Sequence, residues 1–178
     1  TPYDRGIENE GIGSWAESNA VAFSNSYTSL VTNRESGLSA LATALTGWAP
    51  KWGLHLEENR VPNIHVEINC ELTYIADWSV LGDWIGKQIQ PHWKLPWGMM
   101  PHITGLPDYI SFEQKKALTA AAANYGSPML WAAGHSTDPP LDKDSNGKNS
   151  TSVHSRLRSS SFTSDNSRPK SSSFADDY

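Results

Sequence analysis

The chain has 178 residues, a formal net charge of −5 and a pI near 5.6. This balance argues against a nucleic-acid surface as the main function, because such surfaces carry a basic excess. The single cysteine, Cys70, excludes an intramolecular disulfide and cannot alone supply the thiolates of a structural zinc or iron–sulfur site, so we expect a cytoplasmic protein. No apolar run approaches the roughly 20 residues that cross a bilayer. Since the first residue is Thr1 rather than methionine, we expect the true start to lie upstream.

The first half of the chain predicts helices and one strand. Apolar residues recur at helical spacing over 14–30, which predicts a helix with one buried face. A second helix is predicted over 36–46, ending at Gly47. Strict alternation over 64–70 predicts a strand in which Cys70 is a buried thiol.

The second half continues this alternation. Helical spacing returns over 77–89, and a short apolar run over 99–103 is consistent with a strand. The next helix opens at Ser111, a plausible N-cap with Gln114 in the capping-box position, and an apolar run over 128–133 indicates a further strand. Strands and helices in this order predict an α/β fold, as a layered domain with short strands joined by crossover helices.

The composition changes sharply near residue 137. From there on the chain is rich in serine and poor in large apolar side chains, and no hydrophobic period survives. Such a segment cannot bury enough apolar surface to fold. We therefore predict a folded region over 1–136 and a disordered tail over 137–178.

Three clusters of polar side chains lie among apolar runs of the folded region, over 14–20, 32–35 and 53–60. A buried polar group without a partner costs about 1–3 kcal/mol. The clusters are therefore either hydrogen-bonded caps and loops or parts of a ligand site, and both readings stay open. The histidines are scattered without metal-ligand spacing, so no histidine metal site is expected.

The first two clusters can form one anion site. Glu17 and Asn19 point about 200° apart on an ideal helix, so they serve one site only if the helix begins near Ser18. They then flank a helix N-terminus, which attracts carboxylate or phosphate. Arg34, beside Asn33, can clamp an anion through two hydrogen bonds. This combination predicts a site for a small hydroxy acid. The available acid/base groups are Glu17, Glu57 and Glu58.

The order and spacing of several motifs resemble the catalytic domain of the aconitase X family. These motifs are Thr1-Pro2-Tyr3, Trp15-Ala16-Glu17-Ser18-Asn19-Ala20, Thr32-Asn33-Arg34 and Gly53-Leu54-His55-Leu56-Glu57-Glu58-Asn59-Arg60. The likeness continues through Glu71-Leu72, Gly105-Leu106-Pro107 and the alanine-rich run over 117–123. It covers about residues 1–135 and implies a fragment of that domain.

The resemblance implies a hydro-lyase with an aconitase-like α/β fold. The family includes cis-3-hydroxy-L-proline dehydratases and phosphomevalonate dehydratases, and its iron–sulfur cluster acts as a Lewis acid on the leaving hydroxyl. We predict an acid/base or orienting role for Glu17 and hydrogen bonds to substrate from Ser18 and Asn19. The predicted substrate-binding residues are Asn33, Arg34, His55, Glu57, Asn59 and Arg60.

The resemblance also implies parts that this chain lacks. A cysteine of the family stands immediately before the position of Thr1, and Cys70 matches no cluster ligand, so we expect the iron–sulfur ligands to be absent from this chain. A small swivelling domain or subunit is the implied protein partner. We expect the chain alone to be inactive. A hydroxyproline substrate is favoured because the tail composition looks eukaryotic. The alternatives are a phosphomevalonate-type substrate and a non-catalytic remnant or interaction protein that works through its tail.

Overall fold

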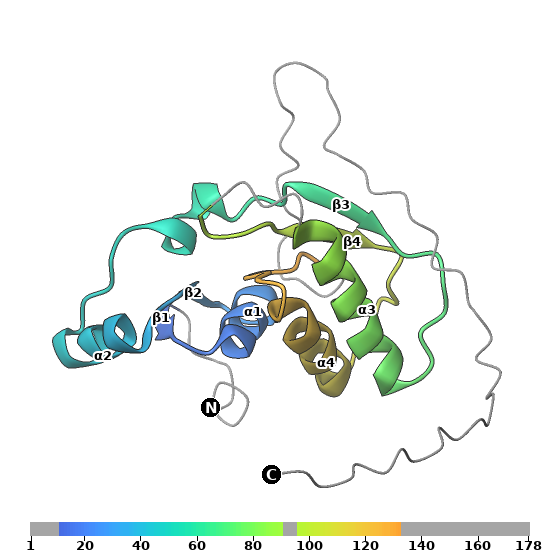
Figure 1. Cartoon of the computed structure of the whole chain (residues 1–178), viewed down its shortest axis with the longest axis horizontal. Helices are drawn as coiled ribbons and strands as arrows, with labels where there is room; N and C mark the ends of the chain where they lie inside the picture. The colour runs from blue at the N-terminus through green and yellow to red at the C-terminus, as the bar shows by residue number, and fades with distance from the viewer. Residues whose placement is uncertain (1–10, 91–95, 133–178) are drawn as a thin grey trace, which may run out of the picture.

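Two short parallel sheets organise the protein, and each has two strands connected through a helix (Figure 1). The computed structural model describes residues 11–90 and 96–132, so the predicted tail and the boundary near 137 lie outside the described residues. In the first sheet, β1 (Gly11–Trp15) pairs with β2 (Leu30–Arg34) through α1 (Ser18–Tyr27). In the second, β3 (Ile64–Glu67) pairs with β4 (Pro101–Thr104) through α3 (Ile75–Ile89). The predicted α/β fold is confirmed.

The remaining elements connect and extend these two units. After β2 come α2 (Gly37–Thr46) and two 3-10 turns, η1 (Gly53–His55) and η2 (Glu57–Asn59). After β4 comes α4 (Phe112–Ala123). The strand predicted over 128–133 is reduced, within the described residues, to a parallel bridge between Trp131 and His102. None of the helices in the described ranges is long and apolar enough to span a membrane.

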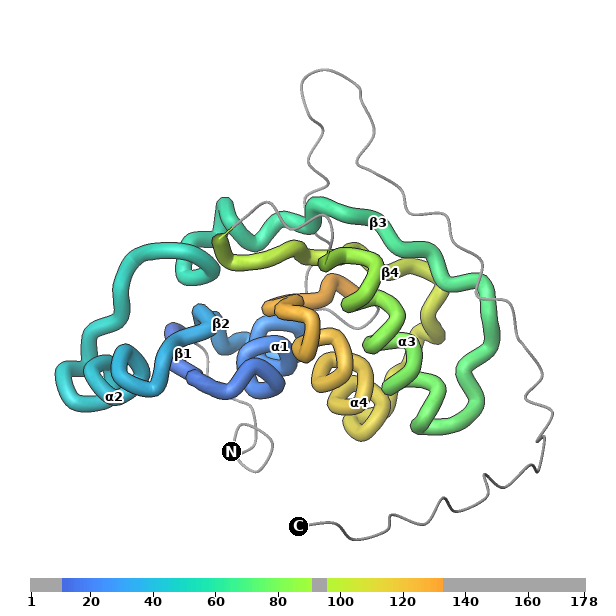
Figure 2. Tube along the Cα trace, viewed as in Figure 1, coloured from blue at the N-terminus to red at the C-terminus, as the bar shows by residue number. Residues whose placement is uncertain are grey.

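The main core lies between the second sheet and α3 and α4. The predicted stripe of α3 is buried, and it packs against Ile64, Val66 and Ile103 on one face of the sheet. Burying each such side chain contributes about 1.5–3 kcal/mol. Helix α4 packs against both α3 and α1, and Figure 2 shows the three helices in a row. The stripe of α3 consists of Trp78, Leu81, Ile85 and Ile89.

Helices α3 and α4 approach closely because α3 presents glycines at the contact. A Cβ atom added to Gly82 would overlap the backbone carbonyl oxygen of Leu118, and one added to Gly86 would overlap the ring of Tyr125. At Gly82 the backbones of the two helices therefore contact each other directly, and at Gly86 the missing side chain makes room for the ring of Tyr125.

Gly82→Ala is expected to lower the free energy of unfolding by about 1–3 kcal/mol, because the methyl group forces the helices apart. Gly37→Ala is the matched control, since Gly37 is also helical but has open space where the methyl group would be. That substitution is expected to be neutral or to stabilise by up to about 1 kcal/mol. Urea unfolding of both variants measures the difference. Equal effects at the two sites would contradict the close contact.

The helix predicted over 14–30 is too long at both ends. The structure has strands on either side of a shorter helix, which ends where the Thr28 backbone N–H and hydroxyl both bond to the Ser24 carbonyl, at 3.1 and 2.8 Å. The strands β1 and β2 are stabilised by pairing with each other, with Trp15 opposite Arg34. Helical spacing within one segment carries no information about such pairing, which explains the wrong boundaries.

Cys70 is exposed, so its prediction as a buried thiol is wrong. The alternation that suggested burial is real up to Ile68, whose backbone N–H still donates to the Thr104 carbonyl at 2.9 Å. After Ile68 the chain leaves the sheet, and Cys70 follows in an irregular segment. Residues beyond the last paired position of the strand are no longer held against the core, so Cys70 is exposed.

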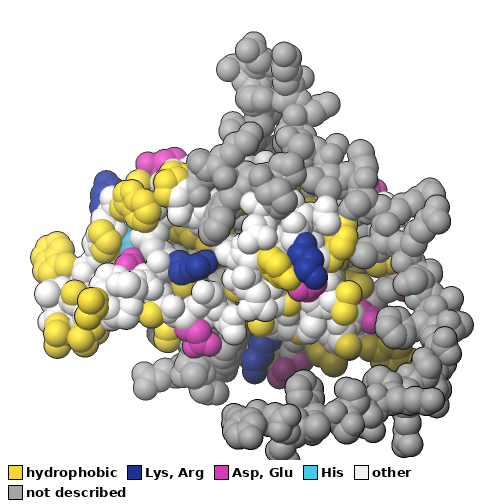
Figure 3. All heavy atoms as spheres, in the orientation of Figure 1, with side chains coloured by type: hydrophobic (Ala, Val, Ile, Leu, Met, Phe, Trp, Pro, Cys, Tyr) yellow, Lys and Arg dark blue, Asp and Glu magenta, His cyan; other side chains and the backbone are white. Residues whose placement is uncertain are grey.

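Helix α2 has the predicted ends but an unexpected environment. Ser36 caps it through Ser39, and Gly47 ends it in the left-handed conformation at φ 72°. Yet it has no buried residue, and Leu38, Leu45 and Trp48 are 81%, 77% and 82% exposed. Figure 3 shows hydrophobic side chains gathered at the end of the molecule that Figure 1 labels α2.

Because these leucines are exposed, Leu38→Gln and Leu45→Gln are each expected to change the free energy of unfolding by less than about 0.5 kcal/mol. Glutamine has a helix propensity close to that of leucine, so the helix itself is not weakened. Leu118→Ala in the core is the comparison, with an expected loss of about 2–5 kcal/mol. Thermal and urea unfolding measure the differences. A loss above about 1 kcal/mol at the α2 positions would show that this face is buried.

Candidate functional site

Some of the predicted site residues lie at the edge where β1 and β2 end. Trp15 is paired with Arg34 at the carboxyl ends of these strands, and the Glu35 backbone N–H donates to the Trp15 carbonyl at 3.0 Å. Helix α1 begins just after β1, with Glu17 as its N-cap. In open α/β sheets, ligands bind outside the carboxyl ends of parallel strands. The helix begins at Ser18 rather than at residue 14, which meets the condition under which Glu17 and Asn19 flank its N-terminus.

The N-terminus of α1 has free polar groups. Glu17 is exposed and its side chain makes no capping hydrogen bond, while Ser18 and Asn19 are half-buried. The first bond of the helix runs from the Val21 N–H to the Glu17 carbonyl, at 3.0 Å. The N–H groups before it have no acceptor within the helix, and they form its positive end.

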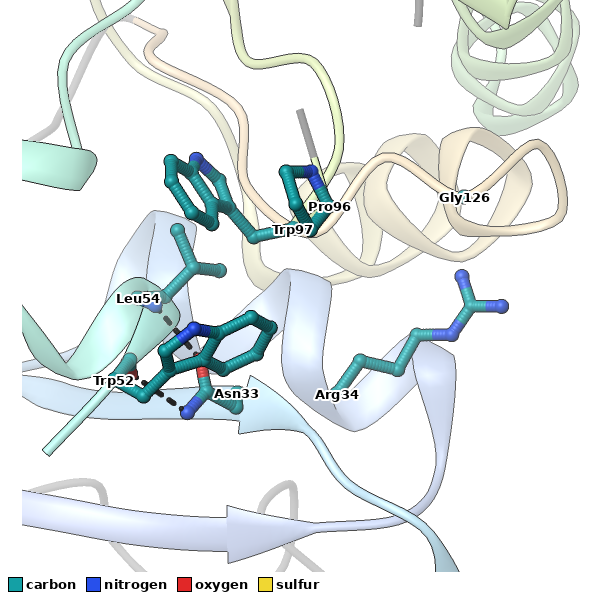
Figure 4. A pocket seen from close by; sticks show the side chains of 7 residues that line it. All are labelled: Asn33, Arg34, Trp52, Leu54, Pro96, Trp97 and Gly126. Carbon is teal, nitrogen blue, oxygen red and sulfur yellow. Dashed lines mark hydrogen bonds between the residues drawn. The ribbon is translucent and has the colours of Figure 1, made fainter. Parts of the chain in front are cut away.

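A pocket of about 240 Å³ opens at the same edge (Figure 4). Among the described residues that line it, Arg34 is the only charged one, and its exposed side chain has no ion pair with any described residue. Trp52 and Trp97 form an edge-to-face pair, with ring centroids 6.1 Å apart and planes at 81°. Glu17, Ser18 and Asn19 are not among the lining residues. The pocket is lined by Asn33, Arg34, Trp52, Leu54, Pro96, Trp97 and Gly126.

Asn33 is buried and shapes the pocket rather than offering its amide to a ligand. Its Oδ1 accepts from the Leu54 backbone N–H at 2.7 Å, and its Nδ2 donates to the Trp52 carbonyl at 3.0 Å. These bonds hold η1 against β2. Gly53 has φ 59°, and a Cβ there would overlap the Asn33 amide. Only glycine allows this close approach.

His55 fixes the same turn from behind. Its Nδ1 lies 2.7 Å from the Pro50 carbonyl oxygen, and its Nε2 lies 3.3 Å from the Asn33 backbone N–H. The Nε2 atom also lies 3.3 Å from the Gly13 carbonyl oxygen, so the ring contacts the backbone of both β1 and β2. His55 therefore serves as a structural clamp, with both ring nitrogens engaged.

The other predicted residues of the third cluster lie away from the pocket. Asn59 donates to the Gly53 carbonyl at 2.9 Å, which stabilises the turn. Arg60 donates to the side-chain and backbone oxygens of Asn25 at 3.0 and 3.3 Å, and burial lowers the pKa of Arg60. Glu57 and Glu58 are exposed. The structure thus brings Asn33 and Arg34 to the pocket, and it gives the third cluster mostly structural bonds.

Asn25 is an important residue that the sequence analysis missed. It is fully buried in α1, where its Nδ2 donates to the carbonyls of Thr32 at 2.8 Å and Pro128 at 3.0 Å. Its Oδ1 accepts from the Thr32 N–H at 3.0 Å and from Arg60. The available signal was a polar residue on the apolar face of a helix, since buried polar groups are almost always bonded. Asn25 joins α1, β2 and the 128–131 segment.

The residues present do not fit an iron–sulfur cluster. Such a cluster is held by several cysteine thiolates, and the chain has only Cys70, which is exposed beyond the end of β3. Within the described ranges, no three histidine, cysteine or acidic side chains are grouped so that they could hold a metal ion. The charged side chain that the described residues bring to the pocket is the guanidinium of Arg34, which is not a metal ligand.

The fold and the pocket define an α/β protein with a cationic pocket at the carboxyl ends of its first strands. Residues 8–58 match the family model of the aconitase X first domain. A crystal structure of Thermococcus kodakaraensis aconitase X in its holo-form superposes with a TM-score of 0.67 and 32% identity, covering 85% of this chain and 37% of that one. The chain belongs to the aconitase X family.

Two kinds of dehydratase are among its relatives. The phosphomevalonate dehydratase large subunit of Methanothermobacter thermautotrophicus is 38% identical over 117 residues, covering 66% of this chain and 27% of the relative. The cis-3-hydroxy-L-proline dehydratase of Pseudomonas aeruginosa is 34% identical over 133 residues, covering 71% and 21%. The phosphomevalonate dehydratase large subunit of Thermococcus kodakarensis is 47% identical over 75 residues, covering 42% and 19%. The chain therefore spans only about a fifth to a quarter of the length of these relatives.

Proposed function

We propose that this chain forms part of a dehydratase that eliminates water from a small hydroxy acid. The observation that carries the proposal is the position of Arg34, the one charged side chain among the described residues that line a pocket beside the N-terminus of α1. The names of the family relatives support the reaction class. An unpaired guanidinium at this edge suits a carboxylate or phosphate group.

Different residues around this edge bind the substrate and transfer the proton. Arg34 holds the anionic group of the substrate through paired hydrogen bonds. Ser18 and Asn19 donate hydrogen bonds to the substrate at the positive end of α1. The Glu17 side chain makes no capping hydrogen bond. It orients the substrate or transfers the proton that joins the departing hydroxyl group to form water. Asn33, His55 and Asn59 keep the turn behind the pocket in place.

The substrate that we favour is cis-3-hydroxy-L-proline. It carries one carboxylate, and the described lining of the pocket has one cationic residue, Arg34. A phosphomevalonate-type substrate has two anionic ends and is the alternative. The iron–sulfur cluster implied by the family resemblance would be held by residues other than those described here. We further propose a small domain or subunit as partner, in line with the "large subunit" in two relatives' names.

The test is an assay of the natural gene product, with its partner subunit where one is co-purified. Water loss from cis-3-hydroxy-L-proline and from phosphomevalonate is followed by mass spectrometry, with iron content measured on the same sample. We expect turnover of the hydroxyproline. Turnover of phosphomevalonate alone would reverse the substrate assignment, and turnover of neither by an iron-loaded sample would support the non-catalytic alternative.

A further inference from the structure

We propose that Trp52 and Trp97 form an aromatic wall that selects a zwitterionic cyclic amino acid by receiving its ring ammonium while Arg34 holds its carboxylate. The inference rests on the proposed function, because it concerns the substrate of the same pocket. Figure 4 shows the two indoles and Leu54 on one side of the pocket and the Arg34 guanidinium on the other. A ligand in the pocket lies between an aromatic side and a cationic side.

Recognition of polar groups in this pocket depends on few side chains. Both polar atoms of the Asn33 amide already form hydrogen bonds, Nδ2 to the Trp52 carbonyl and Oδ1 from the Leu54 backbone N–H. The Trp97 Nε1–H is buried and has no partner among the described residues, so it is not presented to solvent in the open part of the pocket. Apart from Asn33 and Arg34, the described residues whose side chains line the pocket are apolar or aromatic, namely Trp52, Leu54, Pro96 and Trp97.

The aromatic wall is held in place before any ligand binds. The Trp52 backbone N–H donates to the Pro50 carbonyl at 2.9 Å, and the Trp52 carbonyl accepts from the His55 N–H at 3.2 Å. These two bonds fix the backbone of Trp52. Trp97 packs against a cluster of buried residues that includes Leu54 and Met100. Trp52 is nevertheless 51% exposed, so its ring remains available to a ligand. A rigid wall of this kind loses little entropy on binding.

Indole faces carry negative charge density, which attracts cations and disfavours anions. A secondary ammonium next to a carboxylate matches an indole wall opposite a guanidinium. A substrate with anionic groups at both ends would bring its second anion against the rings. The wall therefore discriminates in favour of a proline-like ligand.

The test compares two ligands that differ only in the ring ammonium, L-proline and cyclopentanecarboxylate. Titration calorimetry on the full chain gives both dissociation constants, for the wild type and for Trp52→Leu, Trp52→Phe and Trp97→Leu. We expect the wild type to prefer L-proline by about 5- to 30-fold, a size typical of a partly desolvated cation–π contact. Trp52→Leu is expected to abolish the preference without weakening cyclopentanecarboxylate, and Trp52→Phe to keep part of it. Trp48→Leu, at an exposed tryptophan outside the pocket, is the control.

The outcomes separate this inference from the proposed function. A tryptophan-dependent preference in a protein that turns over neither substrate supports the wall and contradicts the dehydratase. Turnover of hydroxyproline with an unchanged preference in Trp52→Leu and Trp97→Leu overturns the wall alone. If Trp97→Leu fails to fold, as judged by circular dichroism, the two Trp52 variants decide. An equal preference in Trp52→Leu and the wild type would then overturn the inference.

Discussion

Arg34→Ala is expected to reduce kcat/KM for a carboxylate substrate by about 10- to 1,000-fold, because two charge-assisted hydrogen bonds are lost. Arg34 lines the pocket and pairs with no described carboxylate, so its removal leaves no buried charge behind. The fold should therefore be unaffected, and the variant should unfold at the same temperature as the wild type. Steady-state kinetics together with thermal unfolding separates loss of binding from loss of structure.

Two further variants sharpen this result. Arg34→Lys keeps the charge but not the paired geometry, and we expect it to recover only part of the activity. Lys87→Ala removes the same charge from an exposed site on α3, where Lys87 pairs with Asp83 at 2.7 Å. It is expected to leave kcat/KM within about 2-fold, since exposed charges at a distance are screened. Unchanged turnover in Arg34→Ala would refute the anion-binding role.

Asn25→Ala is expected to lower the free energy of unfolding by about 3–5 kcal/mol. The substitution leaves the buried Thr32 N–H and the Pro128 carbonyl without the Asn25 amide, and Arg60 keeps only its bond to the Asn25 backbone oxygen. A domain of this size is stable by only about 5–15 kcal/mol, so much of the margin is lost. Urea unfolding, followed by far-ultraviolet circular dichroism, measures the change.

Asn69→Ala is the matched control, because Asn69 is exposed beyond β3 and its side chain makes no hydrogen bond with a described residue. Its expected effect is within about 0.5 kcal/mol. Asn25→Asp tests the chemistry further, since it keeps the oxygen that faces Arg60 but loses both donated bonds. If Asn25→Ala unfolds at the same urea concentration as Asn69→Ala, the amide does not join the elements as described.

Local sequence signals predicted the elements whose cause is local. The stripe of α3 and the caps of α2 and α4 depend on residues within one or two turns of each other, and all three are confirmed. The strands β1 and β2 depend on each other across the intervening helix, and the sequence analysis missed both. The burial of Cys70 was wrong for a related reason, because it depended on where strand pairing stops.

The candidate site shows the same division. The sequence analysis placed Glu17 inside a helix over 14–30 and gave the start near Ser18 only as the condition for an anion site, and the structure has Glu17 as the N-cap of α1. The structural bonds of Asn33 and His55 were not predicted, since their partners lie in a turn about twenty residues away in sequence. A motif shows that polar groups are concentrated, but only the fold shows which of them bond to the backbone and which, like Arg34, remain available.

The bonds between α1 and the 128–131 segment have a consequence for the order of folding. The Asn25 and Pro128 partners are 103 residues apart, and the Leu130 N–H reaches the Ser26 hydroxyl across 104 residues. Contacts of such sequence separation slow folding, because a long loop must close before they form. During synthesis, the first β–α–β unit is complete long before its buried polar groups find these partners. The pocket lined by Arg34 can therefore be completed only late, after α4 has been synthesised and has packed against α1.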